Sequence, residues 1–588
     1  MIKLFKKINK KEYSMIFISL IFIVLQVGLE LEIPSYMSTI TERLEKQGTT
    51  INQILQPGMM MILLSIFSVI ASIIVGYLAA HVAAGFTARL RSQIFNQVMD
   101  YSTQDIKKFS VSSLLTRSTN DLTQLQQFIA MGLQVIIKAP ITAIWAITKI
   151  ANKGWQWTTA TAVAVIVLIV MLTFILGMVQ PKFKMVQSLT DRLNLVTREN
   201  LSGIRVVHAY NAEDYQNDKF NQANKDLTDT NLFANRVLAL MNPGMSFISS
   251  TLTLSVYAIG AIIINQATAS ATRLTLFSNM IVFSSYAMQV ILGFLLLSII
   301  FILLPRVTVS VSRINQVLDV KPSVVSEKET TEDVEQTGTI EFKDVSFRYP
   351  HAEADAIHNL SFAAQQGQTI AIIGSTGSGK STVMNLIPRL YDVTQGQVLV
   401  DGVDVKNYAI EDLNNRLGYI PQKAVLFSGS IRSNLDFGQT DITAKKSDQQ
   451  LNQALEIAQS RDFVDQKRDQ LDSKVAQHGD NFSGGQKQRL AVARAIARKP
   501  EILLFDDSFS ALDYETDKKL RKALKEKAAK TTKVIIAQRI STIMDADQII
   551  VLDNGNVAGQ GTHHELLKNN QVYQEIAYSQ LSKEELAE

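Results

Sequence analysis

Residues 374 to 381 carry the chemistry that the rest of the chain has to position. They read Gly374-Ser375-Thr376-Gly377-Ser378-Gly379-Lys380-Ser381, fit the pattern G-x-x-x-x-G-K-[ST] without a mismatch, and are followed by Thr382. In such a loop the glycines let backbone N–H groups turn toward phosphates, the lysine neutralises their charge, and the final serine can ligate Mg²⁺. An isolated match could be a chance glycine turn, so the flanking elements and partner motifs decide the interpretation.

A second candidate is a pair of carboxylates at the end of an apolar run. Residues 502 to 505 read Ile-Leu-Leu-Phe, and Asp506 and Asp507 follow them. Because ligands of parallel α/β sheets bind at the carboxyl ends of strands, we expect Asp506 to face the phosphates and their Mg²⁺. Taken alone, the run is equally consistent with a buried strand that ends in solvated acidic residues. The phosphate loop favours the metal-binding interpretation.

A third candidate is a set of small residues that precedes a helical pattern. Ser483, Gly484, Gly485 and Gln486 come directly before the helical stretch 487–498. Small residues at a helix start leave backbone donors available to an anion. One chain does not need two anion sites for one nucleotide, so we expect this segment to serve a nucleotide held by another chain.

The elements around the phosphate loop fit its role. The apolar run 369–373 has strand character, and the segment 381–391 has a helical pattern with apolar residues on one stripe. Alternating residues at 338–349 predict further strands. These patterns predict an α/β P-loop nucleotide-binding domain over residues 338–588, preceded by an acidic polar linker at 321–337.

Composition separates this half of the chain from the first half. Among 588 residues, 47% are hydrophobic and 19% charged, but the first half is far more apolar than the second, and a chain of this length needs at least two domains. A net charge of +4 is too small to argue for a nucleic-acid partner. The chain has no cysteine, which excludes disulfides, thiolate catalysis and cysteine metal sites.

The first half predicts an all-α transmembrane domain over residues 1–320. Four windows contain no Asp, Glu, Lys or Arg, and each can supply the roughly 20 apolar residues that a bilayer requires; they are 51–88, 154–180, 237–272 and 274–305. With two further stretches, the chain predicts six spans near 15–40, 58–84, 128–150, 157–180, 243–266 and 274–304. The lipid bilayer is therefore an expected partner.

The long polar segments 86–126 and 181–236 predict helical extensions beyond the membrane. Five lysines among the first 11 residues place the N-terminus in the cytoplasm, and the parity of the spans then puts these extensions and the nucleotide-binding domain there. Trp155 and Trp157, at the start of one span, are expected to be interfacial anchors.

Charged residues within the predicted spans include three that the bilayer makes costly. Glu30, Glu32 and Lys138 could line a substrate path, since intramembrane charge usually faces a cavity or a partner. For Lys138 we favour snorkelling or an ion pair between helices. For the two glutamates both interpretations stay open.

These motifs together resemble those of the ATP-binding cassette exporters, over nearly the whole length of the chain. The resemblance implies ATP and Mg²⁺ as cofactors, Tyr349 as the residue that stacks on adenine, and Gln422 as the Q-loop glutamine near the metal. It also assigns 374–381 as the Walker A loop, 483–486 as the signature, Asp506 as the Walker B aspartate and 510–513 as the D-loop. It further implies short coupling helices near 104–109 and 211–215.

Two positions depart from the pattern of that family. Asp507 stands where the catalytic base is a glutamate, and Gln538 stands where a switch histidine is expected. A carboxylate displaced by roughly 1 Å can lose about a hundredfold in rate. Glutamine cannot carry the charge or exchange the proton that histidine can. We therefore expect a degenerate site that holds ATP and hydrolyses it slowly.

The signature is intact except that Phe482 stands where leucine is more common. In this family each ATP lies between the Walker motifs of one chain and the signature of the other, so a homodimer would have two defective sites. The resemblance therefore implies a heterodimer with a homologous half-transporter that supplies the missing Glu and His. The expected function is ATP-driven export of small hydrophobic or amphipathic compounds of the multidrug type across the plasma membrane. The alternatives are a lipid or peptide exporter and a nucleotide-gated regulator.

Overall fold

The chain forms two compact units in the computed structural model, which describes residues 2–44, 48–151, 154–267, 269–326, 336–438 and 446–582. The first unit comprises Met1–Met99 and Val111–Val320, and the second comprises Asp100–Ser110 and Lys321–Glu588. A short segment between two long helices of the first unit therefore folds with the second. Residues 327–335, most of the expected linker, lie outside the described part of the chain.

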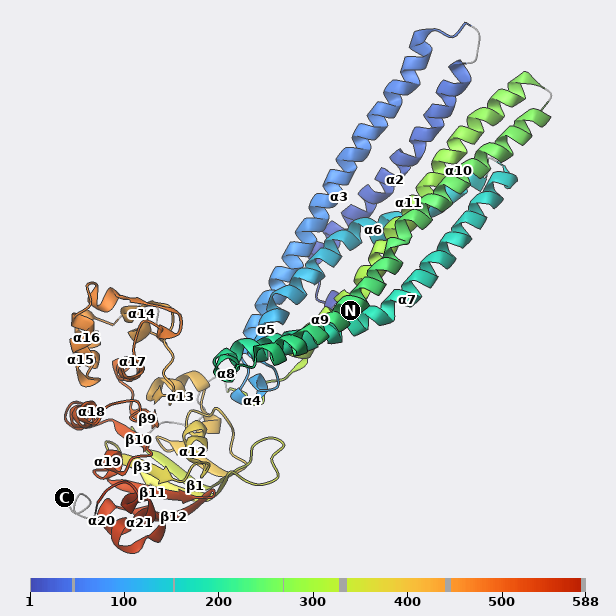
Figure 1. The fold of residues 1–588 in the computed structure, drawn as a ribbon. Helices are drawn as coiled ribbons and strands as arrows, with labels where there is room; N and C mark the ends of the chain where they lie inside the picture. The colour runs from blue at the N-terminus through green and yellow to red at the C-terminus, as the bar shows by residue number, and fades with distance from the viewer. Residues whose placement is uncertain are drawn as a thin grey trace. The chain divides into compact units, whose positions relative to one another are not determined.

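The first unit is a bundle of long helices (Figure 1). Over the described residues six helical stretches are long and apolar enough to cross a membrane, which confirms the predicted six-span, all-α architecture. A helix of 49 residues is about 70 Å long, against roughly 30 Å for the hydrocarbon core, so the longest helices extend well beyond a bilayer. The helices are α1 (Ile2–Phe5), α2 (Lys10–Leu44), α3 (Ile51–Met99), α5 (Val111–Ser118), α6 (Asn120–Ala151), α7 (Trp155–Ser202), α8 (Ile204–Ala209), α9 (Glu213–Ala239), α10 (Met241–Gln266) and α11 (Ser270–Asp319).

Trp157 belongs to the core of this bundle. Its side chain is 1% exposed, and its indole N–H donates to the carbonyl of Val256 in α10 at 3.1 Å. The prediction of an interfacial anchor was therefore wrong for Trp157, whereas Trp155 is 74% exposed. Because two residues turn a helix by about 200°, the two rings face opposite sides of α7.

The charged residues in the spans pair with one another between α2 and α6. Lys138 Nζ lies 2.9 Å from Glu30 Oε1, which also accepts from the hydroxyl of Ser68 in α3 at 3.1 Å. Lys149 Nζ lies 2.5 Å from Glu32 Oε1. These contacts correspond to the ion-pair interpretation of Lys138 and supply partners for both glutamates.

The second unit is built on a mixed six-stranded sheet in the order β12-β11-β3-β10-β9-β6 (Figure 1). The strands β11, β3, β10, β9 and β6 are parallel, and β12 closes the edge antiparallel to β11. A four-stranded antiparallel sheet has the order β2-β1-β4-β5, and β7 pairs with β8. The strands are β1 (Ile340–Phe347), β2 (Ile357–Ala364), β3 (Thr369–Gly374), β4 (Gln395–Val400), β5 (Val403–Asp404), β6 (Leu417–Ile420), β7 (Gly429–Ser430), β8 (Lys474–Val475), β9 (Ile502–Asp506), β10 (Thr532–Ile536), β11 (Gln548–Asp553) and β12 (Asn556–Gly561).

Short helices surround these sheets, and one of them, α4, comes from the segment 100–110. The α/β architecture after the helical bundle confirms the predicted fold class. The helices of this unit are α4 (Thr103–Ile106), α12 (Lys380–Leu386), α13 (Ile410–Arg416), α14 (Ile431–Leu435), α15 (Asp448–Ile457), α16 (Arg461–Asp465), α17 (Gly484–Ala497), α18 (Tyr514–Lys527), α19 (Ile540–Ile543), α20 (His563–Asn569) and α21 (Gln571–Tyr578), with 3-10 turns at Val405–Asn407, Gln470–Asp472 and Gln477–Gly479.

Two expected helices have different bounds. The helix after the phosphate loop ends at Leu386 rather than near residue 391, and Arg389 takes a left-handed backbone with φ of 52°. No short helix covers 211–215, because the left-handed residue Asn211, at φ 49°, interrupts the helical conformation between α8 and α9. Asparagine tolerates the left-handed conformation better than most residues, which explains a break at this position.

Candidate functional site

The carboxyl ends of four parallel strands bring the predicted site residues together. The phosphate loop follows β3, Gln422 follows β6, the pair Asp506 and Asp507 closes β9, and Gln538 follows β10. These strands are neighbours in the order β3-β10-β9-β6, so residues more than 150 positions apart in sequence meet at one edge of the sheet. This is the edge at which open α/β sheets bind ligands.

The phosphate loop can form only with glycine at two of its positions. A Cβ at Gly374 would lie 2.1 Å from the carbonyl oxygen of Leu552, because β11 passes directly beside the loop. Gly379, which caps α12, has φ of 99°, and a Cβ there would meet Ile357 at 2.5 Å. The backbone therefore approaches its neighbours too closely for any side chain, as a loop that wraps a phosphate requires. Ser375, Thr376, Gly377 and Ser378 complete the loop, and the Ser378 side chain is buried.

Lys380 lies over the phosphate loop. Its ammonium donates to the carbonyl oxygens of Gly374 at 2.9 Å and Ser375 at 2.7 Å. Burial lowers the pKa of Lys380, and the nearby carboxylates of Asp507 and Asp506 partly offset that effect. The loop thus concentrates positive charge opposite two aspartates.

Asp506 and Ser381 form the metal-binding candidate. Ser381 Oγ donates to Asp506 Oδ1 at 3.1 Å, and the Tyr419 hydroxyl contacts Asp506 Oδ2 at 3.4 Å. A hydroxyl and a carboxylate at this separation fit Mg²⁺, which is bound through one or two carboxylates and keeps other positions for substrate phosphates and water. Burial raises the pKa of Asp506, and its contacts with Ser381 and Tyr419 oppose the shift. Sequence reasoning missed Tyr419, although a phenol within the otherwise apolar strand β6 was a visible signal.

Asp507 accepts hydrogen bonds from both of the glutamines predicted to belong to the site. Gln538 Nε2 donates to Asp507 Oδ2 at 2.7 Å, and Gln422 Nε2 donates to the same oxygen at 3.1 Å. The residue has a left-handed backbone, with φ of 47°, which aspartate tolerates. Burial raises the pKa of Asp507, and the hydrogen bonds from Gln422 and Gln538 partly counteract that rise. The side chain is thus held between two amides.

Tyr349 lies just after β1 and reaches the helix that follows the phosphate loop. Its hydroxyl is 3.0 Å from Thr382 Oγ1, and its ring stands edge-on to Phe347 at 4.8 Å and to Tyr391 at 5.4 Å. These contacts place a half-buried aromatic ring beside the phosphate loop. That placement suits a residue that stacks on a purine base.

The signature residues begin the long helix α17. Ser483 Oγ accepts from the N–H of Gln486 at 3.3 Å, and Gln486 Oε1 accepts from the N–H of Ser483 at 3.1 Å, which is a reciprocal capping box. Gly484 is exposed, and a Cβ at Gly485 would lie 3.3 Å from the carbonyl of Ala511. Phe482 is buried against Phe463, so it serves as an apolar anchor where leucine was expected.

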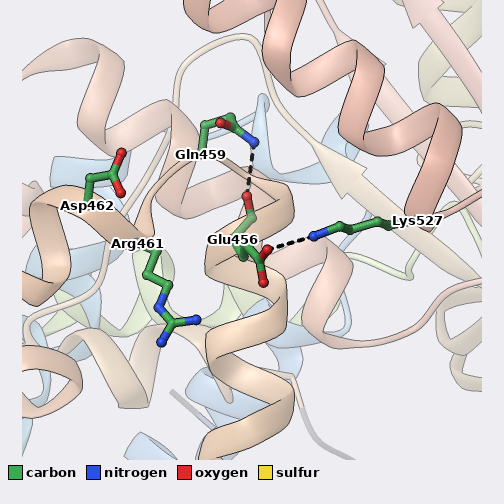
Figure 2. A pocket seen from close by; sticks show the side chains of 5 residues that line it. All are labelled: Glu456, Gln459, Arg461, Asp462 and Lys527. Carbon is green, nitrogen blue, oxygen red and sulfur yellow. Dashed lines mark hydrogen bonds and ion pairs between the residues drawn. The ribbon is translucent and has the colours of Figure 1, made fainter.

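A hollow of about 300 Å³ lies elsewhere on the second unit (Figure 2). It is lined by Glu456, Gln459, Arg461, Asp462 and Lys527, which come from α15, α16, α18 and the turn between α15 and α16. Lys527 pairs with Glu456 at 2.7 Å across it. None of its lining residues belongs to the predicted site, and all five side chains are polar.

Comparison with known proteins supports the same division of the chain. The profile of the ABC transporter transmembrane region matches residues 16–292, and the ABC transporter profile matches residues 357–510. A solved structure of a bacterial Atm1-family ABC exporter with ATP bound superposes with a TM-score of 0.80, covering 96% of this chain and 98% of that one. At 24% identity this likeness concerns the fold alone.

Several curated relatives match nearly the whole chain. An uncharacterized ABC transporter ATP-binding protein of Mycobacterium bovis is 38% identical over 94% of this chain and 93% of its own length. A Bacillus subtilis ABC transporter ATP-binding protein is 33% identical over 98% of both chains. An ATP-dependent lipid A-core flippase of Pseudomonas fluorescens is 29% identical over 88% of this chain and 84% of its own. The chain therefore belongs to the ABC transporters, as a multi-pass exporter half-transporter that carries one transmembrane domain and one ATP-binding domain.

Proposed function

We propose that this chain is one half of a heterodimeric exporter that uses ATP to move hydrophobic or amphipathic compounds out of the cell through the plasma membrane. The proposal is supported by six apolar spans and a phosphate loop in a single chain. In this reading the N-terminus and the ATP-binding domain are cytoplasmic, and the small apolar substrates enter from the bilayer or the cytoplasm. The domain division is 1–320, a linker at 321–337, and 338–588.

Different residues at the strand ends bind different parts of the nucleotide. Tyr349 stacks on adenine, residues 374–382 hold the phosphates, and Lys380 neutralises their charge. Ser381, Asp506 and Gln422 hold Mg²⁺, which when bound supplies charge stabilisation at the phosphates. Residues 483–486 bind the nucleotide of the partner chain from across the dimer interface.

The observation that carries the degenerate-site proposal is the pair of amides on Asp507. A general base must accept a proton from the attacking water through a free lone pair. Gln538 at 2.7 Å and Gln422 at 3.1 Å occupy the two lone pairs of Asp507 Oδ2, so the proton would have to go to Oδ1, on a side chain one methylene shorter than glutamate. An amide cannot take up or return a proton as histidine can. We infer that this site holds ATP for long periods while the partner's site turns over.

The proposed difference in hydrolysis rate between the two ATP sites can be tested in the purified heterodimer, by measuring ATPase activity after changing one chain at a time. Asp507→Asn should leave most of the turnover, whereas replacing the catalytic glutamate of the partner by glutamine should remove it. Turnover that is lost with Asp507→Asn and kept with the partner change would contradict the proposal.

Lipid export is the second candidate, because one relative is a lipid A-core flippase. Proteoliposomes that contain the pair separate the two. ATP-dependent accumulation of hydrophobic dyes supports drug export, and movement of labelled lipid between leaflets supports lipid export. Retained ATP binding without flux of dye, lipid or peptide would favour a nucleotide-gated regulator instead.

A further inference from the structure

Lys107 lies over two aromatic rings beside the phosphate loop. Its ammonium is 5.6 Å from the ring centroid of Tyr349 and 5.6 Å from that of Tyr391. Both distances are within the roughly 6 Å over which a cation is attracted by an aromatic face. Lys107 comes from the segment 100–110, far from either tyrosine in sequence, yet it belongs to the same compact unit.

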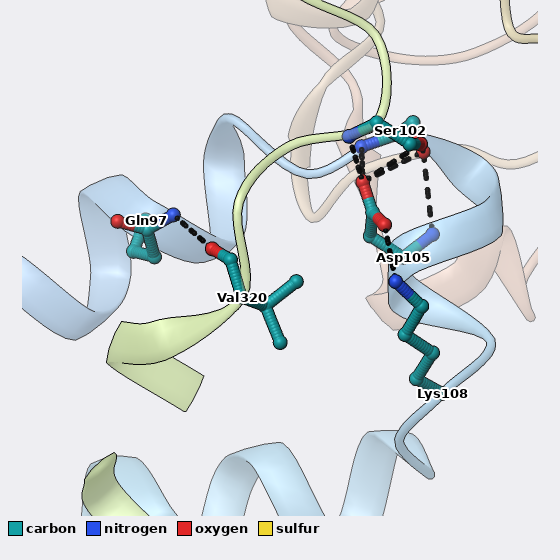
Figure 3. Close-up of polar contacts among 6 residues, drawn as sticks. Gln97, Ser102, Asp105, Lys108 and Val320 are labelled. Carbon is teal, nitrogen blue, oxygen red and sulfur yellow. Dashed lines mark hydrogen bonds and ion pairs between the residues drawn. The ribbon is translucent and has the colours of Figure 1, made fainter. Parts of the chain in front are cut away.

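A buried carboxylate fixes the segment that carries Lys107. Asp105 is 0% exposed, and its Oδ2 accepts from the N–H of Ser323 at 2.8 Å, the Ser323 hydroxyl at 3.0 Å and the Ser102 hydroxyl at 2.9 Å. Lys108 pairs with Asp105 Oδ1 at 2.9 Å (Figure 3). These bonds tie α4 to the start of the polypeptide that leads into the ATP-binding domain. These contacts fix the backbone of the segment that carries Lys107, and none of them involves the Lys107 side chain.

The two rings beneath Lys107 are also fixed. Tyr391 is 4% exposed, and Tyr349 is bonded through its hydroxyl to Thr382 in α12. A hydrogen bond to Tyr391 raises the pKa of Lys107, so the side chain is a cation at neutral pH. A purine that stacks on Tyr349 therefore shares that ring with a positioned positive charge.

We propose that Lys107 is a positioning residue for the nucleotide base, which holds the Tyr349 ring for stacking and makes the first cytoplasmic segment part of the base site. This inference rests on the nucleotide site proposed above, and it adds a residue that no motif of the ATP-binding domain contains. It gives a role to an exposed lysine of residues 100–110 whose ammonium lies over two tyrosine rings. A base bound on Tyr349 would then stabilise the position of α4 directly.

The test compares a ligand that has a base with one that lacks it. Full-length protein in lipid nanodiscs is incubated with radiolabelled ATP, which is displaced by unlabelled ATP or by inorganic tripolyphosphate. For Lys107→Met we expect ATP affinity to fall about two- to fivefold, the range of an exposed cation–π contact, with tripolyphosphate affinity unchanged. Lys107→Arg keeps the charge and should retain the affinity for ATP.

Two further variants make the result specific. Lys525→Met removes an exposed lysine of α18 in the same unit, and should leave the ratio of the two affinities unchanged. Tyr349→Ala should abolish the preference for ATP over tripolyphosphate.

The outcomes separate this inference from the proposed function. If wild-type protein itself binds both ligands equally, the base site on Tyr349 fails. If wild-type protein prefers ATP and Lys107→Met keeps that preference, or loses affinity for both ligands alike, the role of Lys107 is overturned.

Discussion

At the scale of single residues, the contact between Gln538 and Asp507 carries the proposal of a slowly hydrolysing site. Both side chains come from strand ends in the middle of the sheet, and the donated bond of 2.7 Å points the carboxylate at an amide. Neither residue contacts the phosphate loop through a hydrogen bond in the described part of the chain, so the proposed slow hydrolysis is compatible with ATP binding. On this proposal, the two side chains limit the chemistry.

Restoring those two side chains should restore turnover. The test uses a pair in which the catalytic glutamate of the partner has been inactivated. There we expect Asp507→Glu with Gln538→His to raise ATPase activity about tenfold or more. The longer carboxylate would reach the attacking water, and the histidine could exchange a proton. Phosphate release measures the rate. Adding Lys380→Ala to the double variant should remove the gain, and an unchanged rate in the double variant would show that the defect lies elsewhere.

At the scale of elements, the short helix α4 depends on one buried carboxylate. Ser102 and Asp105 form a reciprocal cap, and Ser323, just after the transmembrane region in sequence, adds two donors. Burial alone would raise the pKa of Asp105, but the hydrogen bonds from Ser323, Lys108 and Ser102 outweigh it and lower the pKa to about 2. The charged form is therefore the one that the fold stabilises.

Asp105→Asn should destabilise the second unit by about 2 kcal/mol at neutral pH, the value of a pKa lowered from its ordinary position near 3.8. Because the folded-state pKa is the lower one, this stabilisation is fully present above about pH 4 and is lost as the pH falls toward 2. Thermal unfolding and hydrogen exchange at 100–110 measure the effect. The exposed neighbour Asp100 supplies the matched control Asp100→Asn, which should change little; equal effects of both variants would refute the role of the Asp105 contacts.

At the scale of the whole molecule, the transmembrane helices are joined by charge as well as by apolar packing. The pairs Glu30–Lys138 and Glu32–Lys149 both connect α2 to α6. An unpaired charge in a bilayer costs several kcal/mol, so each charge of a pair lowers the free-energy cost of the other. Paired charges of this kind fix the relative position of two helices.

Lys138→Met should therefore be more harmful than the loss of both charges. We expect Lys138→Met to lower the free energy of unfolding by about 1–3 kcal/mol, a range that allows for the partial exposure of the pair. The double variant Glu30→Gln with Lys138→Met should recover most of that loss. Thermal unfolding of the full chain in nanodiscs measures this, with Lys184→Met on an exposed helix surface as the control. If the double variant is as stable as wild type but no longer transports, Glu30 and Lys138 belong to the substrate path and not only to the helix contact.

Much of the architecture could be predicted from sequence because its signals are local. Four charge-free windows predicted four of the six spans, and the pattern 374–381 with the run 502–506 predicted two of the four strands on which the site stands. The first strand was expected at 369–373 and is Thr369–Gly374, and the second is Ile502–Asp506. The length of an apolar stretch and the spacing of glycines are both visible within a short stretch of sequence, so they can be recognised without the structure. The break at Asn211 and the burial of Trp157 escaped it. The first is a change of backbone conformation at one residue, and the second depends on which face of α7 meets α10.

The sequence by itself therefore determined the membrane spans, the α/β domain and the identities of Asp507 and Gln538. Only the tertiary structure decided that the amide of Gln538 donates to Asp507, that Lys138 pairs with Glu30, and that Lys107 lies over Tyr349. The physical reason is that each of these contacts joins segments at least 31 positions apart. Their distances are set by the order of strands in the sheet and by the packing of helices, and neither is encoded in any one stretch of the chain.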